Sequence, residues 1–191
     1  MRVISGEARG KKLETIEGLE TRPTLDRVKE SLFNIIQFDI ENSRVLDLFA
    51  GSGGLGIEAL SRGANLAVLC DNSMEAINII NKNLESTKLK EKAIVMGKDY
   101  TLSIKKLAKD GYKFDIIFLD PPYKSNFVAN AIGEIIDLDI LNHNGIIIAE
   151  TDNEMVKENI GIKIYDVRKY GRVKLIFMRK EWYNKWKFLH Y

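Results

Sequence analysis

The sequence predicts one α/β domain with a mainly parallel seven-stranded sheet, an antiparallel C-terminal hairpin and a short N-terminal arm. Two observations predict this architecture. Between residues 44 and 150, short apolar runs alternate with amphipathic helical stretches, which is the pattern of βαβ units. The runs 114–119 and 145–149 are apolar on both faces, as strands between two helix layers must be. A chain of 191 residues also has the size of a single domain, here 1–191.

The first forty residues are expected to form an arm and a helix. Short extended segments around Gly6 and Gly10 predict a hairpin-like arm over 1–13. Pro23 and Thr24 supply a helix start signal, and apolar residues then recur at helical spacing to about residue 37.

From residue 44 onward, strands and helices are expected to alternate. Strands are predicted at 44–49, 66–71, 93–97, 114–119 and 145–150, and helices at 54–62, 73–87, 101–109 and 127–136. Two last strands, 162–169 and 172–179, flank Tyr170 and Gly171, which permits a tight turn and an antiparallel pair. Because ligands of such sheets bind at the carboxyl ends of the strands, the chemically active residues are expected there.

Composition excludes several classes of protein. Cys70 is the single cysteine, so a disulfide scaffold, a zinc finger and an iron–sulfur site are excluded. The N-terminus lacks a long apolar segment and no stretch approaches 18 apolar residues, so neither export nor membrane spanning is predicted. We therefore expect a cytoplasmic protein, and a monomer, because no unassigned apolar surface calls for a partner subunit.

Charge is unevenly distributed along the chain. Residues 163–191 hold nine bases and two acids, or +7, so the other residues carry −5 of the net +2. Bases also recur in the first 30 residues. Basic ends around an acidic middle favour a polyanionic partner, although ordinary solvated charge would give the same composition.

A glycine-rich loop follows the first strand of the predicted sheet. Gly51, Gly53 and Gly56 satisfy GxGxxG, which fits dinucleotide sites and other nucleoside sites alike. Asp47, at the strand end, would repel a pyrophosphate but could hold an ammonium group. S-adenosylmethionine carries an ammonium group and no phosphate, so Asp47 favours this ligand.

Two further acids follow the next strands. Asp71 lies about 20 residues beyond the loop, where a carboxylate can accept both ribose hydroxyls. Asp99 could accept a hydrogen bond from an adenine amino group while Tyr100 borders the ring. Each acid could instead lie in an exposed loop or cap a helix, and Asp71 could cap the helix that begins near Ser73.

The sequence Asp120-Pro121-Pro122-Tyr123 follows the buried run 114–119 directly. A rigid turn would explain the prolines but requires neither the aspartate nor the tyrosine. The Asp120 carboxylate and the Pro121 carbonyl could bind both N–H groups of a nucleobase amine and orient its lone pair. Tyr123 could stack on the extruded base, and Asp120 could accept the proton released after transfer.

These motifs resemble those of class I S-adenosylmethionine-dependent methyltransferases, which have a Rossmann-like fold. More narrowly, the chain is similar to the RsmD family, which methylates guanine N2 in small-subunit (16S) ribosomal RNA. The resemblance covers nearly the whole chain and rests on 2–13, 22–34, 47–56 and 120–123. Asp71 stands where the family more often has Glu, and the tail from Arg179 extends beyond the usual family end.

The resemblance implies roles for individual residues and for the ends of the chain. Its catalytic residues would be Asp120, Pro121 and Tyr123, and no metal is implied. The cofactor would contact Asp47, Phe49, Gly51, Gly53, Gly56, Asp71, Asn72, Asp99 and Tyr100. The RNA contacts would come from Arg2, Arg9, Lys12, Arg22, Thr24, Arg27 and Arg172. Residues 1–40 would form an RNA-binding arm and helix and 41–179 the core. The basic aromatic tail, 180–191, could stack on RNA or dock on the domain.

Three other functions remain open from the residues alone. An adenine-N6 methyltransferase acting on DNA or another RNA would use the same Asp120–Tyr123 turn. A nicotinamide-dependent oxidoreductase would use the glycine loop and Asp71 but not Asp47 or the turn. A noncatalytic RNA-binding module would bind RNA without turnover.

Overall fold

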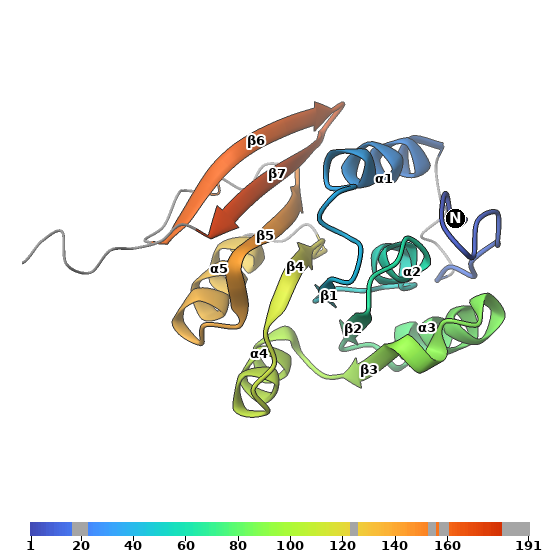
Figure 1. The fold of residues 1–191 in the computed structure, drawn as a ribbon, viewed down its shortest axis with the longest axis horizontal. Coiled ribbons are helices and arrows are strands. Elements are labelled where there is room, and N and C mark those ends of the chain that lie inside the picture. Colours follow the sequence, from blue (N-terminus) through green and yellow to red (C-terminus); the bar gives the residue numbers. More distant parts are fainter. Residues whose placement is uncertain (17–22, 123–125, 153–155, 157–160, 181–191) are drawn as a thin grey trace, which may run out of the picture.

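A seven-stranded sheet forms the centre of the computed structural model, which describes residues 1–16, 23–122, 126–152, 156 and 161–180. The strand order is β3-β2-β1-β4-β5-β7-β6 (Figure 1). The first five in this order are parallel, whereas β7 is antiparallel to β5 and β6 to β7. The strands are β1 (Arg44–Asp47), β2 (Leu66–Asp71), β3 (Ala93–Gly97), β4 (Phe114–Leu119), β5 (Leu141–Thr151), β6 (Ile162–Tyr170) and β7 (Val173–Lys180). The predicted fold class is therefore confirmed.

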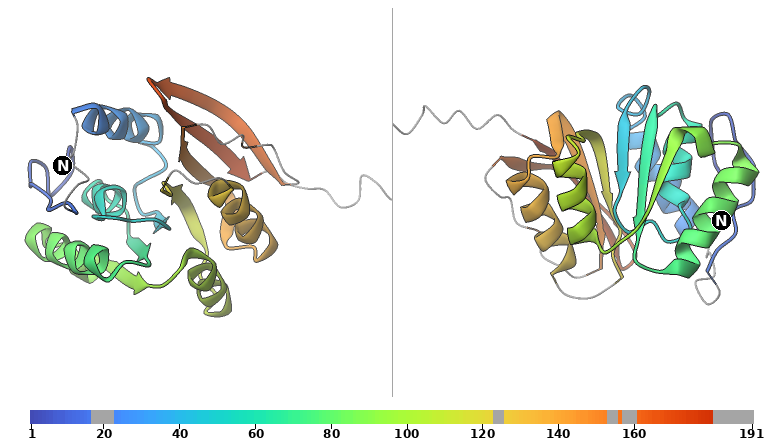
Figure 2. Two further views of the ribbon diagram at one scale, coloured as in Figure 1. Left: turned by 180° about the vertical axis from the view of Figure 1, so that it is seen from behind. Right: turned by 90° about the horizontal axis from the view of Figure 1, so that it is seen from below.

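Helices cover both faces of the sheet. They are α1 (Pro23–Ile35), α2 (Gly54–Ser61), α3 (Met74–Thr87), α4 (Tyr100–Lys109) and α5 (Phe127–Asp137), with a 3₁₀ turn at Lys90–Lys92. The first three pack on one face and the last two on the other (Figure 2). Neighbouring strand residues enter opposite cores, as Val45 and Leu46 do in β1. This double burial explains why the central strands are apolar on both faces.

Some element ends differ from the prediction. Strands β2, β3 and β4 have the predicted bounds, but β1 ends at Asp47 because the chain then turns toward β2, where the Ala50 amide donates to the Cys70 carbonyl (2.9 Å). β5 begins earlier than predicted, because Leu141 already pairs with Phe114 before an irregularity in the register. α1 ends at Ile35, slightly before the predicted end.

The N-terminal arm is a small hairpin, as predicted. Arg2 pairs with Lys12 in an antiparallel bridge, and the Val3 amide donates to the Lys11 carbonyl (2.9 Å). Val3 and Leu13 are buried in the core that also holds α1, α2 and α3. The arm is therefore part of the packed domain.

No helix among the residues that the structure describes is both long and apolar enough to cross a membrane.

Candidate active site

Asp47 ends β1 at the base of the glycine-rich loop. Its carboxylate is 1% exposed and accepts a hydrogen bond from the Gly56 amide (Oδ2–N 3.0 Å). Burial raises the pKa of Asp47 to about 7; the charge of Asp71 adds to this increase, whereas the hydrogen bond from Gly56 opposes it. A cationic group at this carboxylate would favour the ionised form.

The three motif glycines have different reasons to be glycine. A Cβ on Gly56 would lie 2.8 Å from Leu69 Cδ2, and one on Gly53 would lie 3.1 Å from the same atom. These two glycines allow α2 to pack closely on β2. Gly51 has a positive φ of 54°, and a Cβ built on it would meet nothing within 4 Å. The loop thus has free space at Gly51, where a ligand can approach the backbone.

Asp71 joins the end of β2 to the loop. Its two carboxylate oxygens accept hydrogen bonds from the Gly51 and Ser73 amides, each at 2.9 Å. Ser73, not Asp71, caps α3, since its side chain accepts from the Ala76 amide. Asp71 is half-buried and each oxygen retains a second lone pair, so ribose hydroxyls can still bind. Asn72 beside it is exposed.

Asp99 is exposed and caps α4, because its carboxylate accepts a hydrogen bond from the Thr101 amide (2.9 Å). The next residue belongs to an aromatic group. The Tyr100 ring lies 5.4 Å from Phe49 and 5.8 Å from Phe127, measured between ring centroids. Phe49 follows β1, Tyr100 follows β3 and Phe127 begins α5, so this aromatic group borders the carboxyl edge of the sheet.

Asp120 and Pro121 follow β4 directly, beside the end of β1. Burial raises the pKa of Asp120 well above its ordinary value, and the nearby charges of Glu150 and Asp47 raise it further. Ala149 pairs with Leu119, so the register of β4 and β5 brings Glu150 beside Asp120. The loop after β1 and the turn after β4 therefore share one edge of the sheet. The predicted Tyr123 lies outside the described residues.

The predicted RNA-contacting bases lie on three elements. Arg2, Arg9 and Lys12 are exposed on the arm, Arg27 is exposed on α1, and Arg172 is exposed at the turn between β6 and β7. The hydroxyls of Ser31 on α1 and Tyr170 on β6 are hydrogen-bonded, which places that turn beside α1. Arg22 and the side chain of Thr24 lie outside the described part of the chain, as does the tail beyond residue 180.

Sequence reasoning missed three residues that the structure brings to attention. Phe127 completes the aromatic group, and Glu150 lies beside Asp120; strand and helix prediction gives no signal for either contact. Glu58 is fully buried on α2 and binds Lys29 and Arg62. A charged residue within the otherwise apolar segment 54–60 was a signal for Glu58.

The strand order and the glycine loop after β1 define the class I methyltransferase fold. A hypothetical protein of Thermus thermophilus shares this fold, with a TM-score of 0.78 and 27% identity, over 93% of this chain and 98% of that protein. The T. thermophilus 16S rRNA N2 G1207 methyltransferase, solved in complex with AdoMet and guanosine, shares the fold at a TM-score of 0.68 and 21% identity, over 87% of this chain and 45% of that one.

Sequence comparison identifies the family. The model of the family described as conserved hypothetical protein 95 matches residues 1–179, and the chain belongs to this family, the RsmD family predicted from the sequence. The ribosomal RNA small subunit methyltransferase D of Haemophilus influenzae is 37% identical over 154 residues, which cover 81% of this chain and 80% of that protein. Its Escherichia coli K12 counterpart is 35% identical over 154 residues, or 81% of this chain and 76% of that protein. The family match ends at residue 179, where the additional tail was expected to begin.

Proposed function

We propose that this protein transfers a methyl group from S-adenosylmethionine to the exocyclic N2 amine of a guanine in small-subunit ribosomal RNA. The observation that carries the proposal is the position of Asp120 and Pro121 at the end of β4, beside the glycine loop that follows β1. Relatives named as ribosomal RNA small subunit methyltransferases support the substrate class. The T. thermophilus 16S rRNA N2 G1207 methyltransferase, which has the same fold, was solved in complex with AdoMet and guanosine, and these ligands are compatible with the proposed reaction.

The residues at the sheet edge fit S-adenosylmethionine, which supplies the methyl group when bound. Gly51 leaves space beside the backbone, and the half-buried Asp71 carboxylate retains lone pairs for ribose hydroxyls. Asp47 is a buried acid that a ligand ammonium would stabilise in its ionised form. Asp99 and the ring of Tyr100 would border the adenine.

Asp120 and Pro121 would orient the target amine. The carboxylate and the carbonyl each accept one N–H, so the nitrogen lone pair is directed toward the donor methyl group. The new N–C bond then forms as the methyl–sulfur bond breaks, leaving S-adenosylhomocysteine. The methylated nitrogen releases one proton to the Asp120 carboxylate or to solvent. The raised pKa of Asp120 makes this carboxylate a better proton acceptor than an ordinary aspartate.

Glu150 supports guanine over adenine as the target base. Guanine carries an N1–H donor beside its N2 amine, whereas adenine carries an N1 acceptor beside its N6 amine. When Glu150 is ionised, its carboxylate next to Asp120 can accept from guanine N1–H but would repel the lone pair of adenine N1. The two neighbouring acids thus match the donor pattern of the guanine edge.

Transfer of label tests the proposal. The protein is incubated with isotopically labelled S-adenosylmethionine and unmodified small ribosomal subunits or their RNA, and the RNA is digested to nucleosides. We expect labelled N2-methylguanosine. Label on N6-methyladenosine, or preferential labelling of duplex DNA in competition, would overturn the guanine assignment and favour the adenine-N6 enzyme.

An Asp120→Ala variant tests the mechanism. Because Asp120 is assigned to the amine and not to the cofactor, the variant should bind S-adenosylhomocysteine with nearly unchanged Kd and lose methyl transfer. Undiminished transfer by the variant would refute the role of Asp120. RNA binding without transfer by the wild-type protein would instead favour a noncatalytic RNA-binding module. Binding of NADH but not of S-adenosylmethionine would favour an oxidoreductase.

A further inference from the structure

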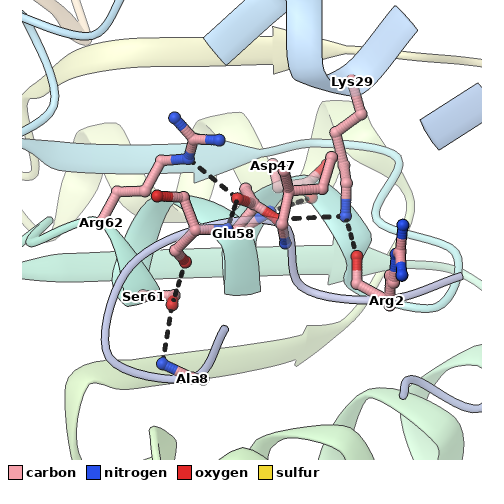
Figure 3. Close-up of polar contacts among 10 residues, drawn as sticks. Arg2, Ala8, Lys29, Asp47, Glu58, Ser61 and Arg62 are labelled. Carbon is pink, nitrogen blue, oxygen red and sulfur yellow. Dashed lines mark hydrogen bonds and ion pairs between the residues drawn. The ribbon is translucent and has the colours of Figure 1, made fainter. Parts of the chain in front are cut away.

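Glu58 is a fully buried acid at the centre of a network that holds the N-terminal arm (Figure 3). Its carboxylate accepts hydrogen bonds from the amides of Ile4 (2.8 Å) and Ser5 (3.0 Å). It also binds Lys29 Nζ at 3.1 Å and Arg62 Nε at 2.8 Å. One side chain of α2 thus connects the arm and α1.

Ser61, three residues further along α2, holds the next part of the arm. Its hydroxyl accepts from the Ala8 amide (2.9 Å) and donates to the Ser5 carbonyl (2.6 Å), and its carbonyl accepts from the Glu7 amide (2.8 Å). A Cβ on Gly6 would lie 1.7 Å from the Ser61 carbonyl oxygen. The arm therefore lies directly on the backbone of α2.

The arm also contacts the glycine loop. The side-chain amide of Asn83 accepts from the Glu14 amide (2.8 Å) and donates to the carbonyls of Glu14 (3.0 Å) and Ser52 (2.9 Å). A Cβ on Gly54 would lie 2.3 Å from Met1 Sδ. The arm is thus tied to the cofactor loop at both of its ends, through Asn83 at Glu14 and by direct packing at Met1.

Glu58 and Lys29 bind the arm through its backbone. Lys29 Nζ donates to the Arg2 carbonyl (2.6 Å) while it pairs with Glu58. The side chains of Arg2, Arg9 and Lys12 are exposed. The buried network therefore holds the arm backbone and leaves Arg2, Arg9 and Lys12, three of the four cations of the arm, facing solvent, where a polyanion can bind them.

We propose that Glu58 is a positioning residue for RNA binding, which fixes Arg2, Arg9 and Lys12 of the arm relative to the cofactor loop without touching RNA or cofactor. This inference rests on the proposed function, because it takes ribosomal RNA as the polyanion. Loss of Glu58 should release the arm and weaken RNA binding through the loss of phosphate contacts.

The test compares Lys29→Met/Glu58→Leu with Lys29→Met alone. The double variant removes the acceptor for the arm amides without leaving Lys29 unpaired. The single variant also loses the bond from Lys29 to the Arg2 carbonyl, but it keeps Glu58 with Arg62 and with the Ile4 and Ser5 amides. Binding of a small-subunit ribosomal RNA fragment is measured as a function of salt concentration. Each lost phosphate contact flattens the slope of log K against log salt by roughly 0.7, so three lost contacts predict a slope flatter by about 2 in the double variant only.

A second comparison separates positioning from general destabilisation. Arg2→Gln/Arg9→Gln/Lys12→Gln should flatten the slope by the same amount, and adding the Glu58 double substitution should then change RNA affinity no further. An additive loss, or an unchanged slope in the Glu58 double variant, would overturn the inference.

If the Glu58 double variant does not fold, Gly6→Ala and Gly10→Ala provide the same comparison. Both glycines have positive φ values, 84° and 83°, but only the Cβ at position 6 meets α2. We expect the flatter slope for Gly6→Ala alone, and equal slopes would overturn the inference. The assay measures binding and not turnover, so a failure of the methylation proposal is recognised independently by the absence of labelled N2-methylguanosine.

Discussion

Cofactor affinity should depend on pH through Asp47. Burial raises the pKa of this carboxyl to about 7 in the ligand-free protein, so acidic solutions protonate it. If the ionised carboxylate holds the ligand ammonium, protonation removes the charge interaction. Affinity should therefore be highest above pH 7 and decrease as the pH falls through 7.

The pKa sets the size of the effect. A carboxyl with a pKa of about 7 is roughly three-quarters ionised at pH 7.5 and about 3% ionised at pH 5.5. If only the ionised form binds the ammonium, the Kd for S-adenosylhomocysteine should rise about 25-fold between these two pH values.

Isothermal titration calorimetry between pH 5.5 and 7.5 measures this dependence. Asp47→Asn keeps a side-chain oxygen for the Gly56 amide but cannot ionise, so its Kd should be weaker at pH 7.5 and nearly independent of pH. 5′-Methylthioadenosine, which lacks the ammonium group, should bind the wild-type protein without the pH dependence. A pH-independent Kd for the wild type, or equal dependence in Asp47→Asn, would refute the role of this carboxylate.

Three further predictions concern packing and specificity. Gly6→Ala should destabilise the protein by about 3 kcal/mol more than Gly10→Ala in urea unfolding. Both variants suffer the same backbone strain, but only Gly6→Ala disrupts the three hydrogen bonds between the arm and Ser61, each worth roughly 1 kcal/mol. Gly56→Ala should cost about 1–3 kcal/mol by crowding the buried Leu69, and an unchanged unfolding midpoint would show that the loop can move aside. Glu150→Ala should reduce the preference for guanine over 2-aminopurine, which has the amine but no N1–H, by about tenfold or more in methylation assays; an equal loss on both bases would contradict its assignment to N1–H.

The sheet could be predicted from sequence because its signals are local. Burial on both faces requires apolar runs, and the bounds of β2, β3 and β4 follow from those runs alone. The glycine loop and the Asp120 turn could be located for a related reason: each directly follows a predicted strand, and the carboxyl ends of parallel strands share one edge.

Contacts between distant segments could not be predicted in this way. Phe127 and Tyr100 lie on different helices, and no periodicity relates them. Glu150 could be placed on a strand, but its position beside Asp120 depends on the pairing of β4 with β5. Strand order is a property of the whole fold, so the composition of either strand does not reveal this neighbour.

The buried charges show the same difference between local and long-range information. Lys29 and Glu58 are 5% and 0% exposed, and ions so deeply buried are costly unless paired. Lys29 lies on a helix whose neighbouring bases suggested an RNA-contacting surface, so the sequence alone could not separate it from those bases. The structure separates them by burial: Lys29 faces the protein and binds Glu58 and the arm backbone, whereas Arg27, on the same helix, is exposed. If the proposed RNA surface is correct, Arg27 can reach phosphate, whereas Lys29 can act only through the groups that it binds, Glu58 and the Arg2 carbonyl.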